Sequence, residues 1–200
     1  MPHELVIGYK RWWPRRYAVR MSSVTAPVHR LSVEDVYRMV EVGVLDENDR
    51  VELVEGVLVD MVPIAPEHDG ATAWLTRHFA RVESEAWEVR VQSMLLVAGG
   101  YLLPDLMLVA PLPRSSLPTT AHLVVEIAQT SQARDRDKAR IYAAADVSEY
   151  WTVDLPARTL IVHRHPLAGV YQEITIFADG ASIKPLLTDA PAAEITELFG

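Results

Sequence analysis

The chain has 200 residues, of which 50% are hydrophobic and 23% are charged, and its formal net charge is −8. This balance excludes a mainly disordered chain, and the absence of cysteine excludes disulfide scaffolds, thiolate zinc sites and cysteine nucleophiles. Because no run of about 18 apolar residues and no signal peptide is recognisable, we expect no membrane-spanning helix and a location in the reducing cytoplasm.

The first 30 residues show no convincing periodicity, and we predict that residues 1–30 form a poorly ordered basic extension. Within residues 1–20, five basic side chains stand against Glu4 alone, which gives a net charge of +4, so the other 180 residues carry −12. That acidic remainder argues against general nucleic-acid binding, because phosphate contacts need local positive charge. The segment is interpreted as an extension upstream of a natural start at Met21, with a basic aromatic arm as the alternative.

Residues 31–200 are predicted to form a single domain. The expected elements, in chain order, are a helix from Val33 to Gly43 behind a Ser32–Asp35 capping box, a β-hairpin over 51–62, a helix over 67–85, strands over 89–97, 105–109 and 122–128, a helix over 134–145, strands over 149–153, 159–163 and 170–177, and a short helix over 192–199. This order predicts a mixed α/β fold with one central mixed β-sheet flanked by α-helices.

One carboxylate stands in the middle of the most hydrophobic predicted strand, 122–128. The residues on both sides of Glu126 alternate between two apolar faces, as in a central strand that is buried on both sides. An unpaired buried charge is very costly, so we expect Glu126 to be neutralised, paired or bound to a metal ion. A structural ion pair with an arginine is the alternative.

A second carboxylate, Asp105, follows Pro104 at the start of another predicted strand, where proline is tolerated. Neighbouring strands lie about 4.8 Å apart, so Asp105 and Glu126 can converge on one cation. Magnesium prefers hard oxygen ligands and usually takes one or two carboxylates together with water and phosphate. On its own, Asp105 would be interpreted as a turn residue.

The helix after Glu126 carries Lys138 and Tyr142 four residues apart, on a face that should point at the sheet. From this face Lys138 can reach back towards Glu126, where it could orient or deprotonate a water and stabilise charge on a phosphate. A solvated pair with Asp135 is the alternative for Lys138. We interpret Tyr142, Tyr150 and Trp151 as core residues.

Eight short segments occur in the order in which one known family has them. They are Arg50–Gly56, Pro66–His68, Val91–Gln92, Pro104–Asp105, Val125–Ile127, Asp135–Lys138, Tyr142 and Glu149–Asp154. Through them the chain resembles the Uma-two family of restriction-endonuclease-like proteins, which belongs to the PD-(D/E)XK nuclease superfamily. The resemblance covers about residues 31–180 and implies a restriction-endonuclease-like core with an N-terminal helix and a β-hairpin.

The resemblance also implies roles for particular residues. Asp105 and Glu126 match the family's metal ligands, with the backbone carbonyl of Ile127 as a further ligand, and Lys138 matches a lysine supplied from the helix. Two other positions match polar site residues and one matches a site-lining residue; these are Glu52, His68 and Gln92.

The activity implied is that of a metal-dependent endonuclease that uses Mg²⁺, with Mn²⁺ as a substitute. Its substrate would be nucleic acid, DNA in the first instance, and a homodimer is expected because a duplex has two strands. Val57 departs from the family pattern, which often has a glutamate there, and Lys138 follows Asp135 by three residues where four are more usual. Two alternatives stay open: a weakly active or inactive interaction protein that keeps the fold, and a metal-dependent hydrolase of small phosphate esters.

Overall fold

The computed structural model describes residues 27–61, 63–128, 132–187 and 189–200. The predicted extension over residues 1–30 therefore lies outside the described residues except for 27–30, which are irregular and exposed. The helices are α1 (Val33–Glu41), α2 (Pro66–Ala80), α3 (Gln132–Ala144) and α4 (Ile195–Leu198). No helix in these ranges is long and apolar enough to cross a membrane.

The strands of the described residues form three sheets. They are β1 (Val51–Val54), β2 (Val57–Asp60), β3 (Glu88–Val91), β4 (Leu95–Val97), β5 (Gly100–Leu102), β6 (Leu106–Val109), β7 (Leu123–Ala128), β8 (Glu149–Asp154), β9 (Thr159–Leu167), β10 (Val170–Ala178), β11 (Ser182–Ile183) and β12 (Ala193–Glu194). A central six-stranded sheet has the order β10-β9-β8-β7-β6-β3, a second sheet has the order β2-β1-β5-β4, and β11 pairs with β12.

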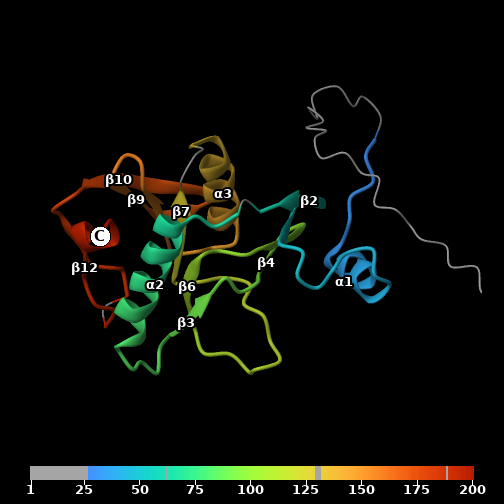
Figure 1. The fold of residues 1–200 in the computed structure, drawn as a ribbon, viewed down its shortest axis with the longest axis horizontal. Helices are drawn as coiled ribbons and strands as arrows, with labels where there is room; N and C mark the ends of the chain where they lie inside the picture. The colour runs from blue at the N-terminus through green and yellow to red at the C-terminus, as the bar shows by residue number, and fades with distance from the viewer. Residues whose placement is uncertain (1–26, 62, 129–131, 188) are drawn as a thin grey trace, which may run out of the picture.

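The central sheet is mixed and is covered by one helix on each face (Figure 1). Strand β7 pairs antiparallel with β6 and parallel with β8, and the connection from β7 to β8 runs through α3. Helix α2 packs on one face and α3 on the other, while α1 and β2 lie at the end of the molecule remote from the C-terminus (Figure 1). This arrangement is a restriction-endonuclease-like mixed α/β fold, as predicted.

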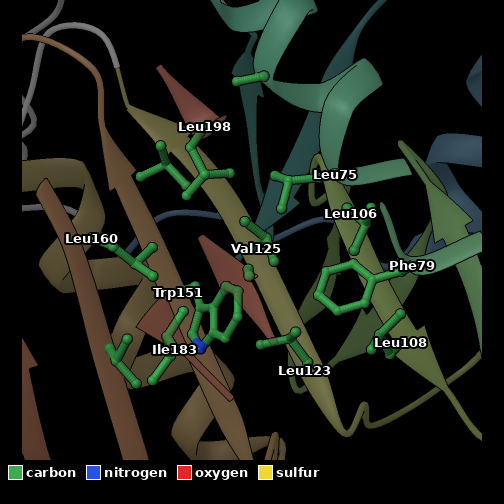
Figure 2. Packing of buried hydrophobic residues seen from close by; sticks show 14 of the residues in the cluster. Leu75, Phe79, Leu106, Leu108, Leu123, Val125, Trp151, Leu160, Ile183 and Leu198 are labelled. Carbon is green, nitrogen blue, oxygen red and sulfur yellow. The ribbon is translucent and has the colours of Figure 1, made fainter. Parts of the chain in front are cut away.

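Strand β7 contributes side chains to two separate cores. Leu123, Val125 and Ile127 pack with α2, in the cluster that surrounds Phe79 and Trp151 (Figure 2). Val124 packs on the opposite side, in a cluster that also holds residues of α3. Burial of both faces confirms that β7 is a central strand, and it places the side chain of Glu126 on the face that α3 covers.

Local sequence signals explain the ends of several elements. Ser32 accepts a hydrogen bond from the Asp35 N–H while the Asp35 carboxylate accepts one from the Ser32 N–H, which is the predicted capping box and contributes about 1 kcal/mol. Glu55 and Gly56 both have positive φ, at 48° and 77°, so they form the two-residue turn that suits the β1–β2 hairpin. Asp146 closes α3 with φ of 55°, where a glycine would fit with less strain.

The predicted strand over 89–97 was wrong, because two strands of different sheets share this stretch. Gln92 has φ of 44°, a conformation that ends β3 and redirects the chain into β4. The prediction of one sheet was likewise incomplete, since the hairpin joins β5 and β4 in a second sheet. A side chain on Gly100 would collide with the Leu53 carbonyl oxygen, so only glycine permits the close pairing of β5 with β1.

Two predicted helices also have different bounds. The helix predicted over 67–85 ends at Ala80, because the residues that follow form a turn before β3. The last predicted helix, over 192–199, is reduced to α4, with the short strand β12 directly before it. Neither change alters which residues reach the centre of the molecule.

Candidate active site

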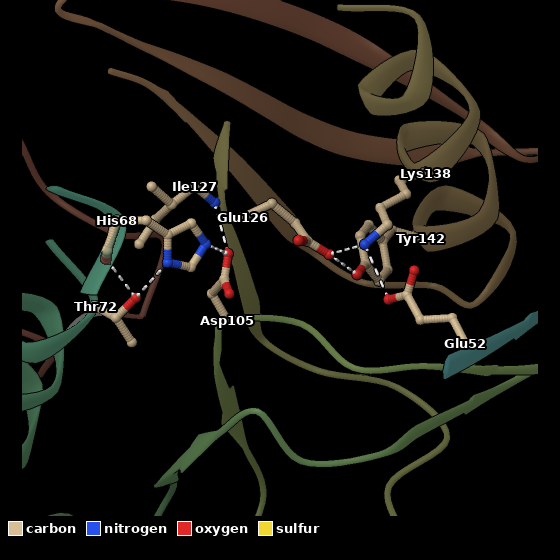
Figure 3. A network of polar contacts seen from close by, with 8 residues as sticks. All are labelled: Glu52, His68, Thr72, Asp105, Glu126, Ile127, Lys138 and Tyr142. Carbon is tan, nitrogen blue, oxygen red and sulfur yellow. Dashed lines mark hydrogen bonds and ion pairs between the residues drawn. The ribbon is translucent and has the colours of Figure 1, made fainter. Parts of the chain in front are cut away.

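Three charged side chains from three different elements meet beside the central sheet (Figure 3). The Nζ atom of Lys138 on α3 lies 2.9 Å from Oε1 of Glu126 on β7 and 3.0 Å from Oε1 of Glu52 on β1. The three side chains are only 20%, 13% and 7% exposed, respectively. One ammonium group is therefore shared by two carboxylates that are largely withdrawn from water, so it offsets only part of their charge.

Each of the two glutamates is held by a further donor on the same oxygen atom. The Tyr142 hydroxyl donates to Oε1 of Glu126 at 2.5 Å, and the Leu103 N–H donates to Oε1 of Glu52 at 3.0 Å. Lys138 and Tyr142 are one helical turn apart, so both reach Glu126 from the same face of α3. The predicted approach of Lys138 to Glu126 is thus present as a direct hydrogen bond.

Asp105 lies opposite Glu126 on the adjacent strand. Leu106 pairs with Val125 in the antiparallel β6–β7 ladder, and continuing the register by one residue brings Asp105 to Glu126. Oδ2 of Asp105 accepts a hydrogen bond from the Ile127 N–H at 2.8 Å and lies 3.0 Å from Nε2 of His68. This carboxylate is 6% exposed and is reached from the α2 side of the sheet (Figure 3).

His68 belongs to the first turn of α2, and its other ring nitrogen faces Thr72. Oγ1 of Thr72 lies 3.4 Å from Nδ1 of His68 but donates to the His68 carbonyl oxygen at 2.9 Å. The order Thr72, His68, Asp105 superficially resembles a hydrolytic triad. The buried Thr72 hydroxyl already donates its hydrogen bond to the helix backbone, so Thr72 is not available as a nucleophile.

Electrostatics distinguish the roles of the central pair. Burial raises the pKa of Glu126 to about 7; Lys138 opposes this rise, and the charges of Asp105 and Glu52 add to it. Burial alone would lower the pKa of Lys138, but Glu126 and Glu52 outweigh that effect and raise it. Lys138 is therefore a cation at neutral pH, which favours stabilisation of negative charge over removal of a proton.

The pKa of His68 is also raised. Burial alone would lower the pKa of His68, but its hydrogen bond to Asp105 and the charges of Asp105 and Glu126 outweigh this effect, with Arg50 acting in the opposite sense. Arg50 is exposed, directly precedes β1, and falls on the same strand face as Glu52, two residues on. Within the described ranges it forms no ion pair, so its positive charge is available at the edge of the site.

The donor set suits a hard divalent cation. No three His, Asp or Glu side chains of the described residues gather closely enough to enclose a metal ion. Magnesium, however, usually takes only one or two carboxylates and completes its shell with water and substrate phosphate. The hydrogen bonds of the site described above use Oδ2 of Asp105 and Oε1 of Glu126, so Oδ1 and Oε2 take no part in them. Asp105 and Glu126 therefore fit the predicted metal.

The structure brings together most of the residues predicted for the site. Glu52, Asp105, Glu126 and Lys138 share the network, and His68 joins it through Asp105 (Figure 3). Gln92 touches it only through its backbone, because its N–H donates to the Asp105 carbonyl oxygen at 3.2 Å. Ile127 contributes its N–H to Asp105, while the carbonyl role expected of it stays a prediction.

Sequence reasoning missed the contribution of Tyr142, which was assigned to the core. The residue is indeed fully buried, but its hydroxyl belongs to the site. The spacing of four from Lys138 was the signal that could have identified it. An ion pair with an arginine was the alternative for Glu126, but the partner of Glu126 is Lys138. The buried carboxylate that pairs with an arginine is Glu149, which Arg164 contacts at 2.7 Å.

Comparisons with known proteins agree with this architecture. No curated protein sequence matches the chain. A crystal structure titled as "a putative nuclease belonging to DUF820" from Anabaena variabilis superposes with a TM-score of 0.67, covering 80% of this chain and 95% of that one at 17% identity, which supports the fold alone. The Uma2 family, described as "Putative restriction endonuclease", matches residues 33–192. The chain belongs to the Uma2 family.

Proposed function

We propose that this protein is a Mg²⁺-dependent endonuclease that hydrolyses phosphodiester bonds of nucleic acid, DNA in the first instance. The observation that carries the proposal is the juxtaposition of Asp105 and Glu126 on paired strands, with Lys138 hydrogen-bonded to Glu126. Family membership supports the same reaction class. Hard oxygen donors and one adjacent cation are the groups that metal-assisted phosphodiester hydrolysis needs.

In this proposal Asp105 and Glu126 hold the metal ion, with the Ile127 carbonyl as a further ligand. When bound there, Mg²⁺ supplies Lewis-acid polarisation of the phosphate and lowers the pKa of a bound water, and Mn²⁺ can replace it. His68 and the Ile127 N–H keep the Asp105 carboxylate in place through Oδ2.

Lys138 contributes positive charge next to the reacting phosphate. Its raised pKa keeps it protonated, so it orients the attacking water and stabilises the negative charge that develops on the phosphate. Glu52 anchors the ammonium from the opposite side and thereby limits the positions that Lys138 can take. The products are a 5′-phosphate and a 3′-hydroxyl.

Binding of a nucleic acid needs local positive charge, whereas the residues after the first 20 carry a net charge of −12. Arg50 is exposed at the edge of the site and acts electrostatically on His68, so we assign it a contact with a backbone phosphate. The homodimer expected for cleavage of both strands of a duplex remains a prediction, which sedimentation analysis of the full chain would test.

The test is cleavage by the purified full chain. Duplex DNA, single-stranded DNA and RNA are incubated with Mg²⁺, Mn²⁺ or EDTA, and the product ends are identified by labelling before and after phosphatase treatment. Metal-dependent products with 5′-phosphates are expected. Absence of cleavage of every nucleic acid with either metal, across sequences and modifications, would overturn the proposal.

A second candidate is hydrolysis of small phosphate esters, favoured by the charge of −12 outside the first 20 residues. Parallel assays with bis(p-nitrophenyl) phosphate would separate the two functions, because turnover of this ester without cleavage of nucleic acid points to the second. An inactive interaction protein is the remaining alternative, suggested by the valine at Val57. Calorimetry that detects no Mg²⁺ or Mn²⁺ binding at millimolar concentration would favour it.

A further inference from the structure

Tyr142 is a buried residue whose polar end points into the proposed site. Its side chain has no exposed surface, and its ring packs against Tyr150 with centroids 5.0 Å apart. Its hydroxyl donates to Oε1 of Glu126 at 2.5 Å (Figure 3). A buried tyrosine that serves only to fill the core does not require a carboxylate as its hydrogen-bond partner.

The two donors to Glu126 converge on one oxygen atom. Lys138 and Tyr142 both bond to Oε1, so the same oxygen is fixed twice and Oε2 takes no part in these bonds. The terminal torsion of a glutamate is otherwise broad, so hydrogen bonding decides which oxygen faces which partner. One oxygen of Asp105 is likewise fixed twice, since both His68 and the Ile127 N–H form hydrogen bonds with its Oδ2.

Tyr142 is better suited than Lys138 to fix this geometry. The lysine is flexible and divides its ammonium between Glu126 and Glu52, and in the proposed reaction it also interacts with the substrate. The Tyr142 ring is rigid and fully buried, and it packs at a tilt against the ring of Tyr150.

We propose that Tyr142 is a positioning residue that fixes Oε1 of Glu126, so that Oε2 is the oxygen offered to a divalent cation. The inference rests on the proposed function, because it concerns the same carboxylate. Tyr142 would thus hold the Glu126 carboxylate as His68 holds the Asp105 carboxylate, with the two residues acting from opposite faces of the sheet. Hydrogen-bond partners that orient metal ligands typically change metal affinity or activity 10- to 100-fold when they are removed.

The test compares two tyrosine-to-phenylalanine variants of the full chain. Tyr142→Phe removes the hydroxyl at Glu126, and Tyr171→Phe is the matched control, because Tyr171 is also buried and donates a single hydrogen bond, to the Val147 carbonyl oxygen. Both variants keep the aromatic ring, and circular dichroism verifies their folding. Mn²⁺ affinity is measured by calorimetry without nucleic acid, and kcat and KM are measured separately.

We expect Tyr142→Phe to bind Mn²⁺ about 10- to 100-fold more weakly, with a lower kcat and an almost unchanged KM for nucleic acid. Tyr171→Phe should stay within about twofold of the wild type in each measurement. Equal affinities for the wild type and Tyr142→Phe, or equal losses in both variants, would overturn the role of Tyr142 while the nuclease proposal stands. A wild-type chain that neither binds Mn²⁺ nor cleaves nucleic acid would overturn both.

Discussion

Lys138 on α3 donates a 2.9 Å hydrogen bond to Oε1 of Glu126 on β7, an ion pair that ties the crossover helix to the strand directly before it. The ammonium also binds Glu52 in the second sheet, so three layers of the protein share one charge cluster. Without Lys138, two largely buried carboxylates would face Asp105 with no counter-charge. The same residue thus serves folding and, in our proposal, chemistry.

Replacement of Lys138 by methionine should destabilise the metal-free protein by about 3 kcal/mol, because removing one partner of a buried pair leaves unpaired charge. Urea unfolding measures the loss, and added Mg²⁺ should recover part of it by supplying positive charge. Arg38→Met is the control, since Arg38 and Glu34 form an exposed pair whose loss costs at most about 1 kcal/mol. Equal unfolding midpoints for Lys138→Met and the wild type would contradict this account of the cluster.

Glu52 and Glu126 should behave differently when each is changed to glutamine. Oε1 of Glu52 is bound by Lys138 and by the Leu103 N–H, and we give Glu52 no part in metal binding. We expect Glu52→Gln to keep Mn²⁺ affinity within a few fold, whereas Glu126→Gln should lower it at least about 100-fold by removing a charged ligand. Calorimetry measures the Mn²⁺ affinity of both variants. Equal losses of affinity in Glu52→Gln and Glu126→Gln would show that Glu52 is itself a metal ligand.

Arg50→Gln should weaken nucleic-acid binding similarly for all sequences and reduce the slope of log affinity against log salt by about one. The physical reason is the loss of a single phosphate contact and of the counterions it releases. Fluorescence anisotropy with Ca²⁺ in place of Mg²⁺ separates binding from cleavage. Arg38→Gln serves as the comparison, because Arg38 is already paired with Glu34 on α1. A salt slope that is the same in both variants would refute the contact.

The ion pair of Glu149 with Arg164 should matter for stability and not for chemistry. Glu149 is fully buried and accepts hydrogen bonds from Trp151, Arg164 and the Leu186 N–H. Arg164→Met would leave this carboxylate without its counter-charge, and we expect a loss of about 3–5 kcal/mol in urea unfolding. Mn²⁺ affinity of the folded fraction should be unchanged, and a parallel loss of metal affinity would argue that the two networks are coupled.

Acid should destabilise the fold in part through His163. Burial lowers the pKa of this histidine, which packs between Tyr150 and Tyr171. Because the folded-state pKa of His163 lies below the unfolded value of 6.5, the folded protein binds fewer protons than the unfolded chain between these two values. The contribution of neutral His163 to the free energy of unfolding is therefore fully present above about pH 6.5 and is lost as the pH falls through the folded-state pKa. His163→Phe should therefore lose less stability than the wild type between pH 7 and pH 5 in urea unfolding. Identical pH dependence in the two proteins would exclude the effect.

Much of the site could be predicted because it depends on short-range regularities. The strand pattern around Glu126 and the position of Asp105 at the start of a strand placed the two carboxylates on neighbouring strands, and helical spacing aimed Lys138 at them. Each of these inferences needs only the period of one element and the order of its neighbours. The structure agrees with all three.

The remaining features depend on long-range pairing or on local strain. Glu52 was expected at the site through the family resemblance alone, because its approach to Lys138 depends on the pairing of β1 with β5, which relies on Gly100 and has no signal in either strand alone. The turn at Gln92 requires a positive φ that glutamine seldom adopts, so a continuous strand was the natural prediction. Tyr142 was assigned to the core because tyrosine is common there, and only coordinates reveal where a buried hydroxyl points.

The central claim is that Asp105 and Glu126 act together on one cation, and nuclease activity of matched variants tests it most directly. Asp105→Asn and Glu126→Gln are compared with Asp179→Asn, whose carboxylate pairs with Arg158 outside the site. The account predicts metal-dependent cleavage by the wild type and by Asp179→Asn, and a loss of at least about 100-fold in each site variant. Cleavage by Asp105→Asn and Glu126→Gln at the wild-type rate would contradict it.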